Sequence, residues 1–177
     1  MNRSPRAGTP SKRAQSFRVV MDALRRIVRG LRLTARDAER TAGISGAQLF
    51  VLQALAEGKA SSLNDLAVRT CTDQSSVSVV VRRLVERRLV ERTASTLDAR
   101  RIELSLSTAG RRLVRRSPEP TQARLLAGLQ RMGAPELAAL REGLEAIVDA
   151  IGGADKAAGM FFDEDDGPDR RRPARRR

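Results

Sequence analysis

Hydrogen-bonding and cationic side chains gather in two short groups near the middle of the 177-residue chain. The groups are Gln74, Ser75, Ser78, Arg82 and Arg83, and then Arg100 and Arg101. Amides and hydroxyls donate hydrogen bonds to phosphate oxygens, and a guanidinium can donate two parallel hydrogen bonds to the edge of a guanine. The chemistry that these residue types indicate is recognition of a nucleic acid.

The charge balance also points to a polyanionic partner. The chain has 34 Lys and Arg against 21 Asp and Glu, a formal net charge of +13. Such an excess suits DNA or an acidic membrane surface better than a small substrate. No apolar run is long enough to span a bilayer, and the first residues lack the apolar core of a secretory signal. We therefore expect double-stranded DNA as the partner, no membrane association and a cytoplasmic location.

The sequence lacks the usual residues of catalysis and metal binding. It has no His and one Cys, Cys71, so a single chain can form neither a disulfide nor a His/Cys zinc site. Asp73 and Asp98 lack acid–base partners, and the glycines form no phosphate-binding loop. We expect no enzyme activity, no cofactor and no metal.

The first polar group belongs to a predicted helix that follows Asp73. The apolar residues of this stretch recur at helical spacing: Val77, Val80, Val81, Leu84 and Val85. They predict one buried stripe, which leaves Ser75, Ser78 and Arg82 on the outward face.

Both ends of this helix carry suitable residues. Thr72 or Asp73 can cap its start, and the arginines at 87 and 88 suit its carbonyl end. A strand over Ser76–Val79 is the alternative, because serine alternates there with β-branched valine. The run of three valines at 79–81 breaks that alternation and favours the helix.

A two-stranded hairpin is expected next, over residues 89–94 and 102–107. Ile102, Leu104 and Leu106 alternate with polar residues, which is the period of a half-buried strand. The loop between the strands is flanked by Arg92 on one side and by Arg100 and Arg101 on the other. Arginines on such a hairpin can contact phosphates or enter a minor groove.

Helices are also expected before this unit. The first covers about residues 14–40, Ser45 opens the second, and the third covers Leu63–Arg69, with Ser62 and Asp65 resembling a capping box. The second has mostly core residues: Leu49, Phe50, Leu52, Ala54 and Leu55. Short helices followed by a hairpin predict a winged helix-turn-helix, whose last helix enters the major groove. The expected fold class is mostly α with a small β-hairpin wing.

Two more helices are expected after the hairpin, over 108 to about 131, interrupted by Pro118 and Pro120, and over 134 to about 151. The last has an apolar stripe: Leu137, Leu140, Leu144, Ile147, Val148 and Ile151. The stripe either closes a core within one chain or pairs with a second copy, and the length of these helices favours the second copy. Residues 1–13 are expected to be a disordered basic arm. Residues 153–177 are expected to be a disordered acidic-then-basic tail, which either docks on DNA or is a solvated extension.

Several short motifs together resemble the MarR family of bacterial transcriptional regulators. They are Ile44-Ser-Gly-Ala-Gln48, Leu63-Asn-Asp-Leu-Ala67, Val77-Ser78, Asp98-Ala-Arg-Arg101 and Leu104-Ser-Leu-Ser-Thr-Ala-Gly110. The resemblance covers about residues 14–152, and the motif at 98–101 with the segment after it is the most specific part. It implies a homodimer in which about 44–107 form a DNA-binding lobe and about 14–43 and 108–152 form the dimer interface.

The resemblance also implies a function. Such proteins are sequence-specific regulators, commonly repressors, that bind an inverted-repeat operator and lose DNA affinity when a small molecule enters a cleft between lobe and dimer helices. This chain has no His, Tyr or Trp, so its cleft is expected to be aliphatic with arginine at the mouth. The alternative, based on charge alone, is a protein that organises DNA without sequence preference.

The predicted DNA contacts are Gln74, Ser75, Ser78, Arg82, Arg83, Arg100 and Arg101. Gln74 is placed to hold a phosphate at the helix start, and Arg82 can fork onto guanine. Arg83 lies nearer the flank of the helix. By the resemblance, Arg100 enters the minor groove, and Asp98 fixes the wing instead of touching DNA, since a carboxylate would repel phosphate.

Two positions raise separate questions. The family usually has glycine where this chain has Arg88, because the backbone leaves the recognition helix there in a left-handed turn that costs other residues about 1 kcal/mol. Cys71 is expected to be a small buried residue in the turn before that helix. Its alternative role is a peroxide-sensing thiol near a helix N-terminus, although sensors of this family usually place the cysteine in the first helix.

Overall fold

The computed structural model describes residues 11–94 and 102–152. The expectations for the N-terminal arm before residue 11, the wing loop 95–101 and the tail from 153 onward lie outside these residues. Within them no helix is both long and apolar enough to cross a membrane. The element order is α1 Lys12–Ala42, α2 Gly46–Ala56, α3 Leu63–Thr70, α4 Gln74–Glu86, β1 Val90–Ala94, β2 Ile102–Leu106, α5 Thr108–Arg116, α6 Thr121–Gln130 and α7 Ala134–Ala150.

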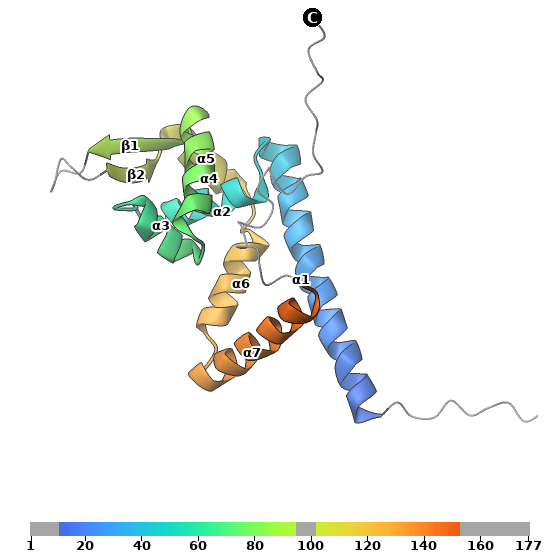
Figure 1. Cartoon of the computed structure of the whole chain (residues 1–177). Helices are drawn as coiled ribbons and strands as arrows, with labels where there is room; N and C mark the ends of the chain where they lie inside the picture. Colours follow the sequence, from blue (N-terminus) through green and yellow to red (C-terminus); the bar gives the residue numbers. More distant parts are fainter. Residues whose placement is uncertain (1–10, 95–101, 153–177) are drawn as a thin grey trace, which may run out of the picture.

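Figure 1 shows two parts: a lobe built from α2–α5 and the hairpin, and an arm built from α1, α6 and α7. The observed class is mostly α with one antiparallel hairpin. This confirms the predicted winged helix-turn-helix class. The helix over 74–86 also shows that the strand alternative for Ser76–Val79 is wrong.

Side-chain caps begin the helices of the lobe where the sequence predicts them. Ser45 and Gln48 form a full capping box, with the Gln48 N–H donating to Ser45 Oγ at 3.2 Å and the Ser45 N–H donating to Gln48 Oε1 at 3.1 Å. Ser62 Oγ accepts from the Asp65 N–H at 3.0 Å. Asp65 does not complete that box, because its carboxylate accepts from the N–H of Ser61 at 2.8 Å.

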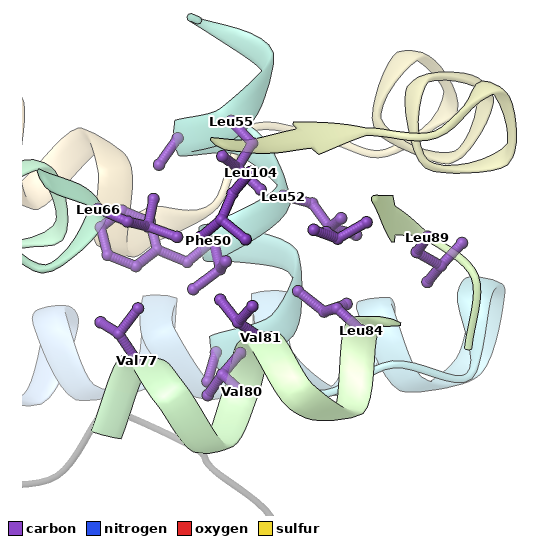
Figure 2. Packing of buried hydrophobic residues seen from close by; sticks show 14 of the residues in the cluster. Phe50, Leu52, Leu55, Leu66, Val77, Val80, Val81, Leu84, Leu89 and Leu104 are labelled. Carbon is purple, nitrogen blue, oxygen red and sulfur yellow. The ribbon is translucent and has the colours of Figure 1, made fainter. Parts of the chain in front are cut away.

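Helix α2 is the centre of the core and is buried along nearly its whole length. Figure 2 shows the side chains of Val77, Val81 and Leu84 pointing from α4 toward Phe50 and the other apolar residues of this core. Four residues of the apolar stripe of α4 are fully buried, as the sequence predicts: Val77, Val80, Val81 and Leu84. Burial of this stripe fixes which face of α4 remains outside.

The hairpin pairs Val90 with Leu106, Arg92 with Leu104 and Ala94 with Ile102. Leu104 also exchanges two backbone hydrogen bonds with Ala60, at 2.8 and 2.9 Å. Leu104 and Leu106 are buried, but Ile102 is 53% exposed, so the prediction of a uniformly buried strand face is wrong at Ile102. Ile102 lies two residues before Leu104 in β2, beyond the bridge that joins Leu104 to Ala60.

The arm joins the lobe through a break between α5 and α6 at Ser117–Pro120, where the two prolines interrupt the helix as predicted. Helix α6 begins against α1: Thr121 Oγ1 donates to the Gly30 carbonyl at 3.1 Å and lies 2.7 Å from Thr34 Oγ1. A Cβ on Gly30 would lie 3.1 Å from Thr121 Cγ2, so the absence of a side chain permits this close crossing. Helix α7 has no buried residue.

Candidate nucleic-acid interface

Helix α4 presents its predicted polar face outward from the lobe. Gln74, Ser75 and Arg82 are exposed, and Ser78 and Arg83 are half-buried. The opposite face is held by the core, so the exposed side chains project from a rigid helix. Polar and cationic groups on a rigid exposed helix are what reading of a DNA groove requires.

Asp73 organises the N-terminus of α4. Its carboxylate accepts from the Ser76 N–H at 2.9 Å and from Ser76 Oγ at 2.7 Å, and the Ser75 hydroxyl also donates to it. The hydrogen bond from the Ser75 hydroxyl, followed by those from Ser76, lowers the pKa of the Asp73 carboxyl well below its ordinary value. The carboxylate is therefore a fixed cap, and Ser75 offers only its oxygen lone pairs to a ligand.

A groove of about 570 Å³ lies between α3, the start of α4 and the hairpin. It is lined by Ser61, Ser62, Leu63, Asn64, Gln74, Arg92, Ile102 and Leu104. Asn64, Gln74 and Arg92 supply amide and guanidinium donors around an apolar floor that includes Ile102. Such a lining can hold the phosphate and sugar of a nucleic-acid backbone that runs beside α4.

The groove adds Asn64, which sequence reasoning did not place in the site, and it also contains Arg92, which the sequence indicated as one of the arginines beside the wing loop. The pairing of Arg92 with Leu104 puts both on the same face of the hairpin, and that face lines the groove. The alternation of apolar and polar residues along β2 indicated on which face of the hairpin Leu104 lies, and Arg92 shares that face. The position of Asn64 depends on how α3 packs and has no local pattern.

Helix α3 is held beside this groove by Arg69. Its guanidinium donates to both Asp65 oxygens at 2.8 and 2.9 Å and to the carbonyls of Gly58 and Lys59 at 3.0 and 2.8 Å. The N–H of Ser61, followed by Arg69, lowers the pKa of the Asp65 carboxyl. These bonds clamp α3 to the turn that precedes it.

Two arginines at the end of α4 have different roles. The guanidinium of Arg87 donates from Nη1 to the carbonyl of Gly43 at 2.5 Å, which joins the end of α4 to the turn between α1 and α2. Arg88 has a positive φ of 57°. Its N–H donates to Val85 at 2.8 Å and the next N–H, of Leu89, donates to Leu84 at 2.9 Å, which together form a Schellman motif.

Comparison with known proteins identifies the lobe. A sequence model of the MarR family matches residues 42–101. The segment over residues 42–101 belongs to the MarR family. That match begins at the end of α1 and ends at the wing loop. It covers α2, α3, α4 and β1 and the groove residues up to Arg92, but not Ile102 and Leu104 of β2.

Individual relatives agree with this assignment. The HTH-type transcriptional repressor MdtR of Bacillus subtilis is 37% identical over 68 residues, which are 38% of this chain and 44% of MdtR. The chain thus spans less than half the length of that curated relative. Among solved structures, the transcriptional regulator BldR of Sulfolobus solfataricus has a TM-score of 0.50 at 22% identity and covers 80% of this chain and 99% of its own.

Wild-type apo MarR of E. coli has the same TM-score of 0.50 at 20% identity, covering 72% of this chain and 95% of its own. At these identities the structural likeness concerns the fold alone. It extends beyond the lobe, because each comparison covers more residues than the lobe contains.

Within the MarR lobe, the structure places Arg88 where the family usually has glycine, and the positive φ bears out the reason for that preference. Ser107 Oγ donates to the Arg88 carbonyl at 2.8 Å, and the same oxygen accepts from the Gly110 N–H at 3.0 Å as the cap of α5. One hydroxyl therefore ties the root of the wing to α5. These contacts hold Arg88 in its left-handed backbone conformation.

Cys71 differs from its predicted placement. The side chain is exposed, so the expectation of a small buried residue is wrong. Cys71 has a φ of 49° and ends α3 in a second Schellman motif, with its N–H donating to Val68 at 3.2 Å and the Thr72 N–H donating to Ala67 at 3.0 Å. The chain reversal directs position 71 outward, and Thr70 is the buried residue of this turn.

Three predicted wing residues, Asp98, Arg100 and Arg101, lie outside the described part of the chain. Their roles on DNA remain predictions. The described residues that the structure brings together are Gln74 and Arg92 in the groove and Arg82 farther along the exposed side of α4. Within residues 11–94 and 102–152 no cluster of three or more His, Cys, Asp or Glu could hold a metal ion.

Proposed function

We propose that this protein is a transcriptional regulator that binds an inverted-repeat operator as a homodimer. The observation that carries the proposal is that the exposed polar face of α4, from Gln74 to Arg82, lies next to the groove that Gln74 shares with Asn64 and Arg92. A helix face that reads bases beside a groove that holds backbone is the geometry of a winged-helix DNA reader. The name of MdtR, a transcriptional repressor, supports repression as the direction of regulation.

The homodimer is supported by the apolar surface that a single chain leaves exposed. On α7, Leu137, Leu144, Ile147 and Val148 are each 42–44% exposed. On α1, the exposed apolar residues that would meet a second copy are Phe17, Val19, Val20, Met21 and Ile27. Two long helices with apolar stripes of this extent need a partner, and a second copy places two recognition helices on one side of a duplex.

An effector site is supported by a cavity of about 400 Å³ where the arm meets the lobe. Its lining comes from the end of α1, from Leu89 and from α5: Thr41, Ala42, Leu89, Ala109, Arg112, Leu113, Arg116 and Ser117. Four of these eight residues are aliphatic, and the two arginines of α5 supply cationic groups. The size suits a small organic anion, whose binding would act on the segment that leads from the recognition helix to the wing.

The experiment that tests the proposed function is selection of bound fragments from random and genomic DNA pools at physiological salt, followed by footprinting. An inverted repeat with half-sites about one helical turn apart supports the dimeric regulator. Tight binding without any preferred sequence, lost steeply with salt, supports the alternative of a protein that organises DNA through its net charge of +13.

A further inference from the structure

Four arginines follow one face of α1 and form a surface that we name the arginine ridge: Arg25, Arg29, Arg32 and Arg36. Their spacing of four, three and four residues is that of a single helix face. Their side chains, with Leu24, Val28 and Leu33, line a shallow groove of about 570 Å³. At 1.5 Å per residue the ridge extends over roughly 16 Å of helix.

The ridge has no carboxylate partner in the part of the chain that the structure describes. The acidic residues of α1 that form ion pairs use other arginines: Asp22 pairs with Arg26 at 4.0 Å and Asp37 pairs with Arg40 at 2.6 Å. Like charges three and four residues apart on a helix repel one another. A polyanion bound along this face would relieve that repulsion.

Packing among residues 11–94 and 102–152 leaves the ridge uncovered. Helix α6 contacts α1 at Gly30 and Thr34. Thr34 is two residues from both Arg32 and Arg36, which places it on roughly the opposite side of a helix with 3.6 residues per turn. Between the arginines, Val28 is 41% and Leu33 is 54% exposed, so the groove offers apolar as well as cationic contacts.

We propose that the ridge binds the acidic segment of the chain's own C-terminal region, Phe161-Phe-Asp-Glu-Asp-Asp166. This segment lies outside the described residues, and its sequence matches the groove in two ways. Its four consecutive carboxylates equal the four guanidinium groups in number, and its two phenylalanines suit the exposed Val28 and Leu33. Charge-assisted pairs with arginine are the stronger kind of surface hydrogen bond.

The length of the intervening chain permits this docking. The last described residue, Gly152, follows α7, and Figure 1 shows α7 returning from the far end of α6 toward α1. The eleven residues from Gly152 to Asp163 can span at most roughly 36–40 Å. The diameter of a helix with its side chains is only about 10–12 Å, so the segment can reach around α1 to the ridge.

Zero-length carbodiimide cross-linking tests this in the full-length protein. The chain has three lysines, at 12, 59 and 156, so replacing the ridge by Arg25→Lys, Arg29→Lys, Arg32→Lys and Arg36→Lys introduces amines at known places. The carbodiimide joins an amine only to a carboxylate in direct contact, and mass spectrometry locates the joined peptides. The matched control makes the same four-fold replacement on α5, at Arg111, Arg112, Arg115 and Arg116, which are also exposed.

The expected result is a cross-link between the ridge and residues 163–166 that is several-fold more abundant than any from α5 and that fades at high salt. Equal yields from α1 and α5 would overturn the proposal, since they indicate nonspecific attraction. Absence of ridge cross-links in the full chain, with their appearance once Arg170–Arg177 is deleted, would also overturn it, because the basic end would then hold the acidic segment. None of these readouts uses DNA, so they are independent of the proposed function.

Discussion

Arg87 Nη1 donates a 2.5 Å hydrogen bond to the carbonyl oxygen of Gly43. The two residues are 44 positions apart in the sequence: Arg87 caps the recognition helix α4, and Gly43 ends α1 with a φ of 61°. Because α1 belongs to the proposed dimer arm, this contact links the arm directly to the helix that is proposed to face DNA. We infer that a shift of α1 on binding of the proposed effector would be transmitted to α4.

Removal of this link should be measurable as lost stability. Arg87→Ala removes an exposed hydrogen bond to a backbone carbonyl, which is expected to lower the free energy of unfolding by about 1 kcal/mol. Urea denaturation followed by circular dichroism gives the value. Arg111→Ala on the exposed side of α5 is the control and should change stability by less than about 0.5 kcal/mol. Equal effects of both changes would show that the contact with Gly43 adds nothing.

Arg88→Gly should stabilise the protein. The backbone at Arg88 has a φ of 57°, and glycine adopts this conformation without the steric cost borne by arginine. The expected gain is about 0.5–1 kcal/mol in the free energy of unfolding. The neighbouring Arg87→Gly is the control, because Arg87 has a φ of −81° and glycine there relieves no strain. It also loses the hydrogen bond to Gly43 and adds flexibility to the unfolded chain, so it should lower stability. A loss of stability in Arg88→Gly would contradict the strain assigned to this turn.

Asp73 should make stability depend on pH in the acid range. Its pKa is lower in the folded protein than the ordinary value of 3.8, because the hydroxyl of Ser75 and the donors of Ser76 stabilise the carboxylate. The carboxylate therefore stabilises the fold at pH values above 3.8, and this contribution is lost as the pH falls below 3.8 toward the folded pKa. The difference in Tm between the wild type and Asp73→Ala should be present at neutral pH and shrink in acid.

Ser76→Ala provides the matching control for the Asp73 cap. It removes one of the two Ser76 donors and should move the decline in stability to higher pH, toward the ordinary carboxyl range. A Tm difference between wild type and Asp73→Ala that stays constant down to the lowest pH at which the chain folds would show that these hydrogen bonds do not favour the charged form.

Arg92 and Arg82 should affect DNA binding in different ways. Arg92→Gln removes a cation from the groove beside the wing, so it should weaken binding to all sequences and reduce the slope of log K against log salt by about one. Arg82→Gln removes a predicted base contact and should alter the selected sequence, at a cost of about 1–3 kcal/mol on the preferred site. Both are measured by fluorescence anisotropy across a salt series.

Arg131→Gln is the control for these charge changes, because it removes the same charge from the exposed end of α6. Its salt slope should equal that of the wild type. Arg92→Gln with an unchanged slope would remove Arg92 from the phosphate contacts. Arg100→Ala in the wing should resemble Arg92→Gln if Arg100 also contacts DNA.

The proposed dimer interface can be tested at Ile147. Ile147 is 43% exposed within one chain, and Ile147→Glu would place a carboxylate in the apolar contact with a second copy. The dissociation constant of the dimer should rise at least tenfold, equivalent to about 1.4 kcal/mol. Ala146→Glu, on roughly the opposite side of α7, should leave it unchanged. Sedimentation velocity distinguishes the 19.4 kDa monomer from the dimer, and a wild type that is monomeric at all concentrations would refute the interface.

Much of the lobe was predictable because its helices are determined by neighbours three or four residues apart. Ser45 and Gln48 mark the start of α2, and the valines of α4 mark its buried face. The pairing of β1 with β2 follows from a short connection and from alternation. The left-handed backbone at Arg88 was also foreseen, through the resemblance to a family that usually has glycine at this position.

Side-chain burial at the edges of the elements was harder to predict. Ile102 continues the apolar alternation of its strand but lies beyond the part of the hairpin that the lobe covers. Cys71 is apolar and small, which favours burial, but the αL turn directs it to solvent. For both residues, the local sequence did not show whether another element packs over the side chain.

The sequence by itself determined the class of fold, the positions of the helices and hairpin, and the cationic, polar character of the outward face of α4. These depend on local spacing, capping and composition, which act within a few residues. Only the tertiary structure decided that Arg87 bonds Gly43, that Asn64 and Arg92 share a groove with Gln74, and that the arginine ridge of α1 is left without a partner in the described chain. Those relationships depend on how elements tens of residues apart pack against α2, and no short pattern encodes that packing.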